Sequence, residues 1–185
     1  VLNLTVASNQ SKGLKAGTIS LTGGTITINT SGAAVLAASG SGYDPSYCTA
    51  VKADTLVDVN GSALTVVATG AAGRGISCDG DIHIESGTVN ITCSGNGSTY
   101  TNTSGVLDAY AAHCLNADRN LVLSGGTITL SNSGSGGKGI SGDANLTIGT
   151  STSSPTLGVT TTGAKIAIGS TGEYTEAKTV SVDST

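Results

Sequence analysis

Residues 75–92 read GISCDGDIHIESGTVNIT, and this stretch decides the fold. An apolar anchor, Ile76, is followed three positions later by Asp79, and the apolar residues Ile82 and Ile84 then alternate with polar ones. A Ser-Gly turn separates this segment from a second alternating segment, TVNIT. Alternation over four to six residues between Gly-rich turns is typical of short β-strands.

The same pattern of apolar anchor, any residue, small residue and Asp recurs along the chain. Its copies are Leu14–Gly17, Val51–Asp54, Ile76–Asp79, Leu115–Asp118, Ile140–Asp143 and Val180–Asp183. The first copy has Gly in place of Asp and a shorter following segment with Ile19 and Leu21 inward. Three short strands in a unit of about 25 residues make one coil of a parallel β-helix, or β-solenoid. We therefore predict a single all-β domain over residues 1–185 with about six coils, stacked roughly 4.8 Å apart.

Composition supports a thin core and excludes two classes of partner. The 185 residues include 28 Gly and no Phe, Trp or Met, so small aliphatic side chains must fill the interior. Charged residues make up 11% of the chain and the net charge is −4, which argues against nucleic-acid binding. No apolar run approaches the roughly 20 residues that a membrane-spanning helix needs.

The spacing of the copies indicates a period of two coils. The anchors stand at positions 14, 51, 76, 115, 140 and 180, so the intervals are 37, 25, 39, 25 and 40 residues. Every second coil thus carries an insertion of about 12–15 residues, and stacking places these insertions on one flank. The sequence begins and stops part-way through a coil, so we expect a segment of a longer solenoid or self-association through the solenoid ends.

Aromatic residues are confined to the insertions in this alignment: Tyr43, Tyr47, Tyr100, Tyr110 and Tyr174. Tyrosine offers an apolar ring to the C–H face of a sugar and a phenol to its hydroxyls, so these residues are candidates for carbohydrate binding. The alternative is that each ring pins its own loop onto the solenoid.

Basic residues form a predicted column two positions before the anchor: Lys12, Thr49, Arg74, His113, Lys138 and Lys178. Lys15 and Lys52 lie close to it in the sequence. Because stacked like charges repel, an anionic partner would be stabilising there. We take Lys12, Lys52, Arg74 and Lys138 as candidate ligand-binding residues; the alternative is neutralisation by neighbouring acids.

Acidic residues form a second column: Asp54, Asp79, Asp118, Asp143 and Asp183. An Asp beside a tight turn commonly accepts backbone N–H hydrogen bonds. Stacked carboxylates also suit calcium, with the insertion acids Asp44, Asp108, Glu173 and Glu176 completing a site. Candidate calcium ligands are therefore Asp44, Asp54, Asp79, Asp108, Asp118 and Asp143.

The four cysteines lack the spacing of a zinc site. Cys78 and Cys93 fall at inward positions, which predicts buried thiols, and the alternative is a disulfide such as Cys48–Cys114. The histidines His83 and His113 fall in different columns and show no arrangement with a nucleophile, so we expect no enzymatic activity.

Several segments together carry a family resemblance: residues 43–54 (YDPSYCTAVKAD), 75–80 (GISCDG), 136–141 (GGKGIS) and 146–155 (LTIGTSTSSP). They resemble the clostridial carbohydrate-binding β-helix family of clostridia and gut Bacteroidales, whose members are secreted or surface lipoproteins. The resemblance implies a right-handed parallel β-helix similar in architecture to pectate lyases, binding of cellulose or acidic sugars, and bound calcium. Gly17, Thr55 and Ala144 depart from the family pattern.

These observations favour a non-catalytic carbohydrate-binding β-helix, extracellular or at the cell surface, that binds an acidic or cell-wall polysaccharide with calcium as a candidate cofactor. The alternative is a structural segment of a surface fibre or adhesin that associates end to end. An ice-binding solenoid would need a regular Thr-x-Thr array, and the outward positions here vary. A polysaccharide lyase shares the predicted fold, but a fold does not specify an activity.

Overall fold

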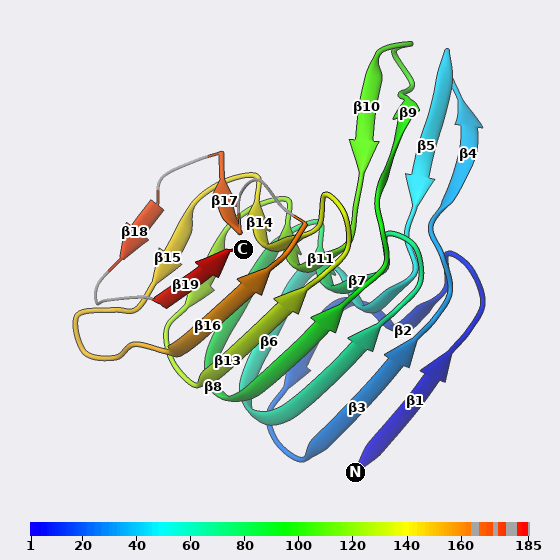
Figure 1. Cartoon of the computed structure of the whole chain (residues 1–185). Helices are drawn as coiled ribbons and strands as arrows, with labels where there is room; N and C mark the ends of the chain where they lie inside the picture. The colour runs from blue at the N-terminus through cyan, green and yellow to red at the C-terminus, as the bar shows by residue number, and fades with distance from the viewer. Residues whose placement is uncertain (164–166, 172–173, 177–180, 185) are drawn as a thin grey trace.

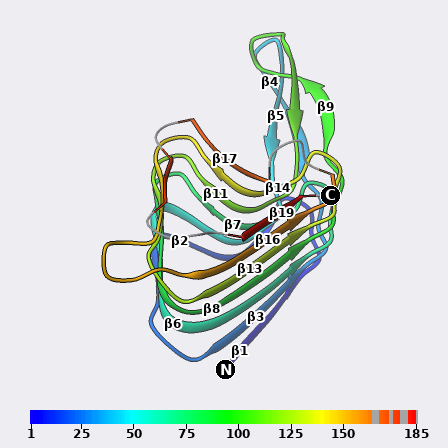
Figure 2. The same ribbon diagram turned by 60° about the vertical axis from the view of Figure 1, so that its left-hand side comes forward.

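The computed structural model describes residues 1–163, 167–171, 174–176 and 181–184, and none of these residues lies in a helix. The chain is all-β, with one large sheet of parallel strands and two small antiparallel hairpins (Figure 1). Because a strand has its parallel partner one repeat further along the chain, the sheet winds around an apolar interior instead of lying flat (Figure 2).

The apolar anchors lie in one continuous ladder. Leu14 pairs with Val51, Val51 with Ile76, Ile76 with Leu115 and Leu115 with Ile140. This register confirms the alignment of the first five copies of the repeat. The ladder is built from β2 (Lys12–Leu21), β6 (Thr49–Ala68), β7 (Arg74–Cys78), β11 (His113–Ala117), β14 (Lys138–Gly142) and β17 (Ile168–Ser170).

Two further ladders complete each repeat. The second continues β2 and β6 through β8 (Asp81–Cys93), β12 (Leu121–Leu123), β15 (Leu146–Ile148) and β18 (Tyr174–Glu176). The third joins β6 and β8 to β1 (Leu2–Val6), β3 (Thr25–Thr30), β13 (Thr127–Asn132), β16 (Thr156–Thr161) and β19 (Ser181–Ser184). Successive repeats therefore stack on one another in a parallel β-solenoid-like architecture.

Small aliphatic side chains and thiols fill the interior. The inward pairs predicted from the alternation, such as Ile82 and Ile84, are fully buried. Cys78 and Cys93 are buried free thiols as predicted, and Cys48 and Cys114 are also buried and free. The alternative of a Cys48–Cys114 disulfide is therefore wrong for this structure, because the interior holds all four cysteines as separate packing residues.

The first two insertions form hairpins: β4 (Val35–Ser39) with β5 (Gly42–Ser46), and β9 (Ser98–Thr101) with β10 (Leu107–Tyr110). They project side by side from one corner of the solenoid, as the alignment predicts (Figures 1 and 2). The backbone N–H of Ser41 donates to the Thr103 oxygen at 2.9 Å, and Tyr43 and Asn102 form an isolated parallel bridge.

The sixth copy of the repeat is misplaced by the sequence alignment. Ile140 pairs with Ile168, not with Val180, and Asp183 pairs with Thr160 in the third ladder, outside the acidic column. Tyr174 lies in β18 and pairs with Leu146, so it belongs to a repeat and not to a third insertion. The predicted alignment fails here because Ile168-Gly169-Ser170 carries no Asp. Among the described residues, no helix has the length and apolarity to cross a membrane.

Candidate functional site

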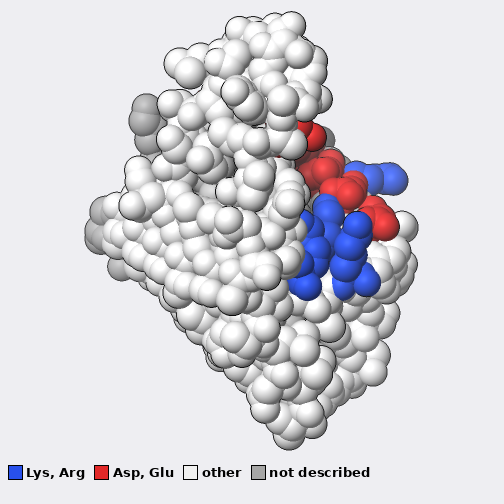
Figure 3. Space-filling view, turned by 90° about the vertical axis from the view of Figure 1, so that its right-hand side faces the viewer, with Lys and Arg blue, Asp and Glu red and all other residues white. Residues whose placement is uncertain are grey.

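A groove opens where the base of the β4–β5 hairpin stands beside the outer face of β2, β6 and β7. Its volume is about 580 Å³. We call it the charged groove and define it by its charged and aromatic lining: Lys12, Lys15, Lys52, Arg74, Asp44, Asp79, Asp118 and Tyr47. Lys/Arg and Asp/Glu side chains gather in adjoining groups on one face of the molecule (Figure 3).

Strand register brings the basic residues together. Lys12 pairs with Thr49 and Thr49 with Arg74, while Lys15 pairs with Lys52. Residues 25 or 37 positions apart in sequence therefore become neighbours at the repeat spacing of roughly 4.8 Å. The register confirms that these positions form the predicted basic column.

The upper part of the basic column lies beyond the groove. His113 pairs with Lys138, whose ammonium nitrogen lies 3.4 Å from the Ser141 hydroxyl. Lys138 is not part of the groove lining. Lys178, the last predicted member of the column, falls outside the described residues.

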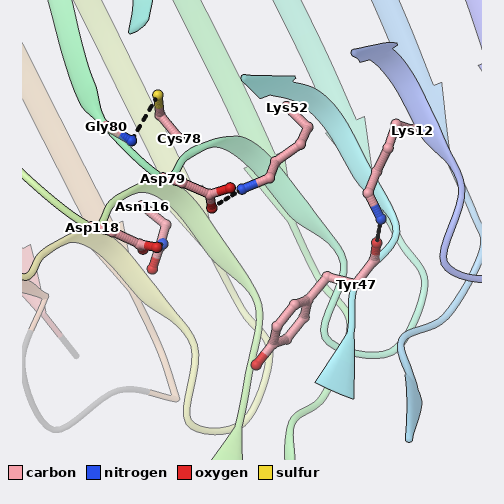
Figure 4. A network of polar contacts seen from close by, with 8 residues as sticks. All are labelled: Lys12, Tyr47, Lys52, Cys78, Asp79, Gly80, Asn116 and Asp118. Carbon is pink, nitrogen blue, oxygen red and sulfur yellow. Dashed lines mark hydrogen bonds and ion pairs between the residues drawn. The ribbon is translucent and has the colours of Figure 1, made fainter. Parts of the chain in front are cut away.

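Lys12 holds the hairpin to the solenoid. Its Nζ donates to the backbone oxygen of Tyr47 at 2.6 Å (Figure 4). It also donates to the backbone oxygen of Gln10 at 2.7 Å. Partial burial lowers the pKa of this ammonium, and the nearby cations Lys15, Lys52 and Arg74 lower it further. Lys12 is thus a positive charge fixed in the groove wall by carbonyl groups and not by an acid.

Tyr47 covers Arg74. The guanidinium carbon lies 3.4 Å from the centre of the Tyr47 ring, a cation–π contact. The Arg74 Nε is buried and has no hydrogen-bond partner. Burial raises the pKa of the Tyr47 phenol and lowers that of the Arg74 guanidinium, which still stays charged at neutral pH.

The acidic column is also formed as predicted over four repeats. The backbone N–H of Asp79 donates to the Ala53 oxygen, that of Asp118 to the Cys78 oxygen and that of Asp143 to the Ala117 oxygen. These hydrogen bonds extend the anchor ladder by one position, so the Asp residues of successive repeats stack, beginning with Asp54. Asp79 forms an ion pair with Lys52. The Asn116 side-chain amide donates a hydrogen bond to the Asp118 carboxylate at 3.3 Å. Burial raises the pKa of Asp118, with the charges of Asp79 and Asp143 adding to the effect.

His113 interrupts the charge of the basic column. It is buried, and its Nδ1 lies 2.8 Å from the Asn116 Oδ1, which makes Nδ1 the protonated nitrogen. Burial and then the Arg74 charge lower its pKa to about 3. His113 is therefore neutral at pH 7, and the chain His113–Asn116–Asp118 runs along the outer face of the fourth repeat.

Tyr43, Tyr100 and Tyr110 do not line the charged groove. Tyr100 and Tyr110 pack edge to face at 5.8 Å on their own hairpin, which favours the loop-pinning alternative for both. Tyr110 also lines a shallower hollow of about 200 Å³ with Ser98 and Gly136. Tyr43 is 45% exposed near the hairpin tip, and Tyr174 lies in β18.

The acidic residues do not fit the predicted calcium site. In the part of the chain that the structure describes, no three His, Cys, Asp or Glu side chains converge around a point where a metal could sit. Asp108 lies apart on β10, where its carboxylate is 3.4 Å from the Asn102 amide and 3.5 Å from the Tyr100 hydroxyl. Asp79 is already paired with Lys52. We derive no role for calcium from this arrangement.

Sequence reasoning missed two features of the site. Asn116 stands between His113 and Asp118 and contacts both. The alternation of the sequence places Asn116 on the outer face but does not predict these two contacts. Pro45 and Ser46 join Tyr47 in the hairpin wall. No periodic pattern predicts this wall, because it depends on how the hairpin leans against the sheet.

Comparison of this chain with protein-family models, with curated proteins and with solved structures found no match. Its function is therefore argued from the residues and geometry of the charged groove.

Proposed function

We propose that this protein is a non-catalytic carbohydrate-binding β-solenoid that holds an acidic polysaccharide in the charged groove. We place it outside the cell or at the cell surface, where such polysaccharides occur. We further infer that the solenoid is a right-handed β-helix of about six coils, because crossover connections between parallel strands are right-handed in nearly all proteins.

The observation that carries the proposal is the row of positive charges contributed by successive repeats. Lys12 and Lys15 come from β2, Lys52 from β6 and Arg74 from β7, and all four line one open groove. A linear polymer with regularly spaced carboxylates could contact several of these cations at once, whereas a small anion would meet one or two. Repeated weak contacts along one chain add up to useful avidity.

Tyr47 and the shape of the groove favour a sugar over a peptide-like polymer. The ring of Tyr47 lies against Arg74 at the groove wall and offers an apolar edge beside charged groups. Sugar rings carry hydroxyls for polar contacts and C–H faces for aromatic ones, and sites of this mixed kind suit them.

Affinity electrophoresis in gels containing polygalacturonate, with cellulose pull-down in parallel, tests the proposal. We expect retardation by polygalacturonate that weakens with added salt, because exposed charges are screened. Lys15→Gln should reduce the retardation. Arg119→Gln is the matched control, because it removes a cation whose side chain is 70% exposed outside the groove. Absence of retardation by any acidic or neutral polysaccharide would contradict the proposal.

A further inference from the structure

The sign of charge changes along the charged groove from one repeat to the next. On the solenoid strands, the first repeat contributes Lys12 and Lys15 and the second contributes Lys52, while Asp44 comes from the β4–β5 hairpin. The third contributes both Arg74 and Asp79, and the fourth contributes Asp118. Figure 4 shows Lys12, Lys52, Asp79 and Asp118 in this order across neighbouring strands.

No basic side chain of the fourth repeat lines the groove beside its acid. His113, which occupies the basic column there, is neutral and bonded to Asn116. Arg119 lies outside the groove lining, with its Nε 4.0 Å from the Asp81 carboxylate. The charges of Lys52 and Arg74 lower the pKa of Asp118, but less than burial, Asp79 and Asp143 raise it, and Lys52 is already ion-paired with Asp79. Asp118 lies instead between the like charges of Asp79 and Asp143, which together with burial raise its pKa. A positive charge placed beside Asp118 would therefore be stabilised, since it relieves repulsion within the acidic column.

A purely anionic polymer satisfies only half of this groove. Its carboxylates are attracted by Lys12 and Lys15, but the same chain continued past Arg74 meets Asp79 and Asp118. Like charges juxtaposed across an interface oppose binding and select against the wrong partner. Lys15 on β2 and Asp118 after β11 are three repeat steps apart, about 14 Å at roughly 4.8 Å a step, so the two charges of the polymer must lie a few sugars apart on one chain.

We propose that the charged groove binds a zwitterionic stretch of polysaccharide, with the carboxylate of an acidic sugar against Lys12 and Lys15 and the protonated amine of a nearby amino sugar against Asp118. This inference rests on the proposed function and narrows it from acidic polysaccharides to those that also carry free amines. It also fixes the direction of the polymer: the anionic sugar lies over β2, and the cationic sugar lies at the end of β11.

A pair of polymers with one backbone tests the inference. The first is an alternating polymer of glucuronic acid and N-acetylglucosamine, and the second is the same preparation after N-deacetylation. Binding of both is measured by titration calorimetry at about pH 6, where amines are protonated and ordinary carboxylates ionised. We expect the deacetylated polymer to bind about two- to fivefold more tightly, the range of one exposed charge pair.

Two variants locate the effect. Asp118→Asn should abolish the preference for the deacetylated polymer and strengthen binding of the acetylated parent, because it removes a like charge from the groove. Asp54→Asn is the matched control, because Asp54 belongs to the same column but lies outside the groove lining. It should leave the preference intact.

The outcomes separate this inference from the proposed function. Equal binding of the two polymers, or a preference that survives in Asp118→Asn, overturns the zwitterionic ligand and leaves acidic-polysaccharide binding standing. Equally tight binding of a polyglucosamine that has no acid also overturns it, because the carboxylate contact would then be unnecessary. If neither matched polymer binds, the inference falls, and retardation by polygalacturonate decides the proposed function separately.

Discussion

The Arg74 guanidinium lies under the ring of Tyr47, with 3.4 Å between the guanidinium carbon and the ring centre. Arg74 is the first residue of β7, and Tyr47 follows the hairpin strand β5, so this contact ties the hairpin base to the solenoid. The Arg74 Nε is buried without a partner, so the guanidinium depends on the ring for stabilisation on that side. The contact between Tyr47 and Arg74 therefore holds the Tyr47 ring in the groove wall and the Arg74 charge beside it.

Replacing Tyr47 should therefore destabilise the fold as well as open the groove. We expect Tyr47→Ala to lower the free energy of unfolding by about 1–3 kcal/mol, because it removes both a desolvated cation–π contact and buried ring area. Tyr47→Phe retains the ring and should stay within about 0.5 kcal/mol of wild type. Urea denaturation measures both. Tyr43→Ala is the control, since Tyr43 is 45% exposed; an equal loss there would contradict this account.

A second prediction concerns the glycines that let neighbouring repeats approach. A Cβ at Gly75 would lie 2.5 Å from the Cys114 oxygen and 2.6 Å from the Ile91 Cγ2. Backbone cannot yield there without breaking the ladder, so Gly75→Ala should lower the unfolding free energy by about 1–3 kcal/mol. Gly17→Ala should be tolerated, because a Cβ there meets no atom within 4 Å. Equal thermal midpoints for the two variants would count against this packing.

Most of the fold follows from local sequence. Period-two alternation and turn residues act over a few positions, and the repeat then multiplies them into ladders, so the register from Leu14 to Ile140 could be read directly. The last repeat could not, because Ile168-Gly169-Ser170 keeps the apolar anchor but loses the Asp. An alignment that relied on Asp moved to Val180–Asp183 instead.

The candidate site, too, is only partly predictable from the sequence. Stacking alone predicts the basic and acidic columns, because equivalent positions of successive repeats must be neighbours. It does not predict which column members face the hairpin, or that His113 is neutral. Nor does it predict that Tyr47 lines the charged groove while Tyr43, Tyr100 and Tyr110 do not. Those features depend on the tilt of an insertion and on burial, which no single repeat of the sequence encodes.

The four cysteines provide a third prediction. All are buried free thiols, and Cys114, which is hydrogen-bonded to Cys93, has a pKa raised well above its usual value. Thiolates are the reactive form, so a thiol reagent should label the native protein slowly and all four sites promptly in denaturant. A reducing agent should leave the thermal midpoint unchanged. A midpoint that falls on reduction would mean that a disulfide stabilises the fold, contrary to the structure.

The pH dependence of stability supplies a fourth prediction, and it rests on His113. Its pKa in the folded protein is about 3, below the ordinary value of 6.5, so between these values the unfolded chain binds the proton and the folded protein does not. The contribution of His113 to the free energy of unfolding is therefore complete above about pH 6.5. It is lost as the pH falls towards 3, by at most about 1.4 kcal/mol per pH unit. Asp118, whose pKa is raised by folding, has the opposite sign.

His113→Gln separates these two contributions, because it removes the histidine proton and keeps a polar side chain beside Asn116. Urea denaturation from pH 4 to 7 should show a shallower loss of stability on acidification in the variant than in wild type. If the variant fails to fold, the imidazole resonances of wild-type His113 serve instead and should stay at their neutral positions down to about pH 4. Parallel pH profiles, or a midpoint near 6.5 for His113, would show that this imidazole is solvated and that the basic column continues unbroken through the fourth repeat.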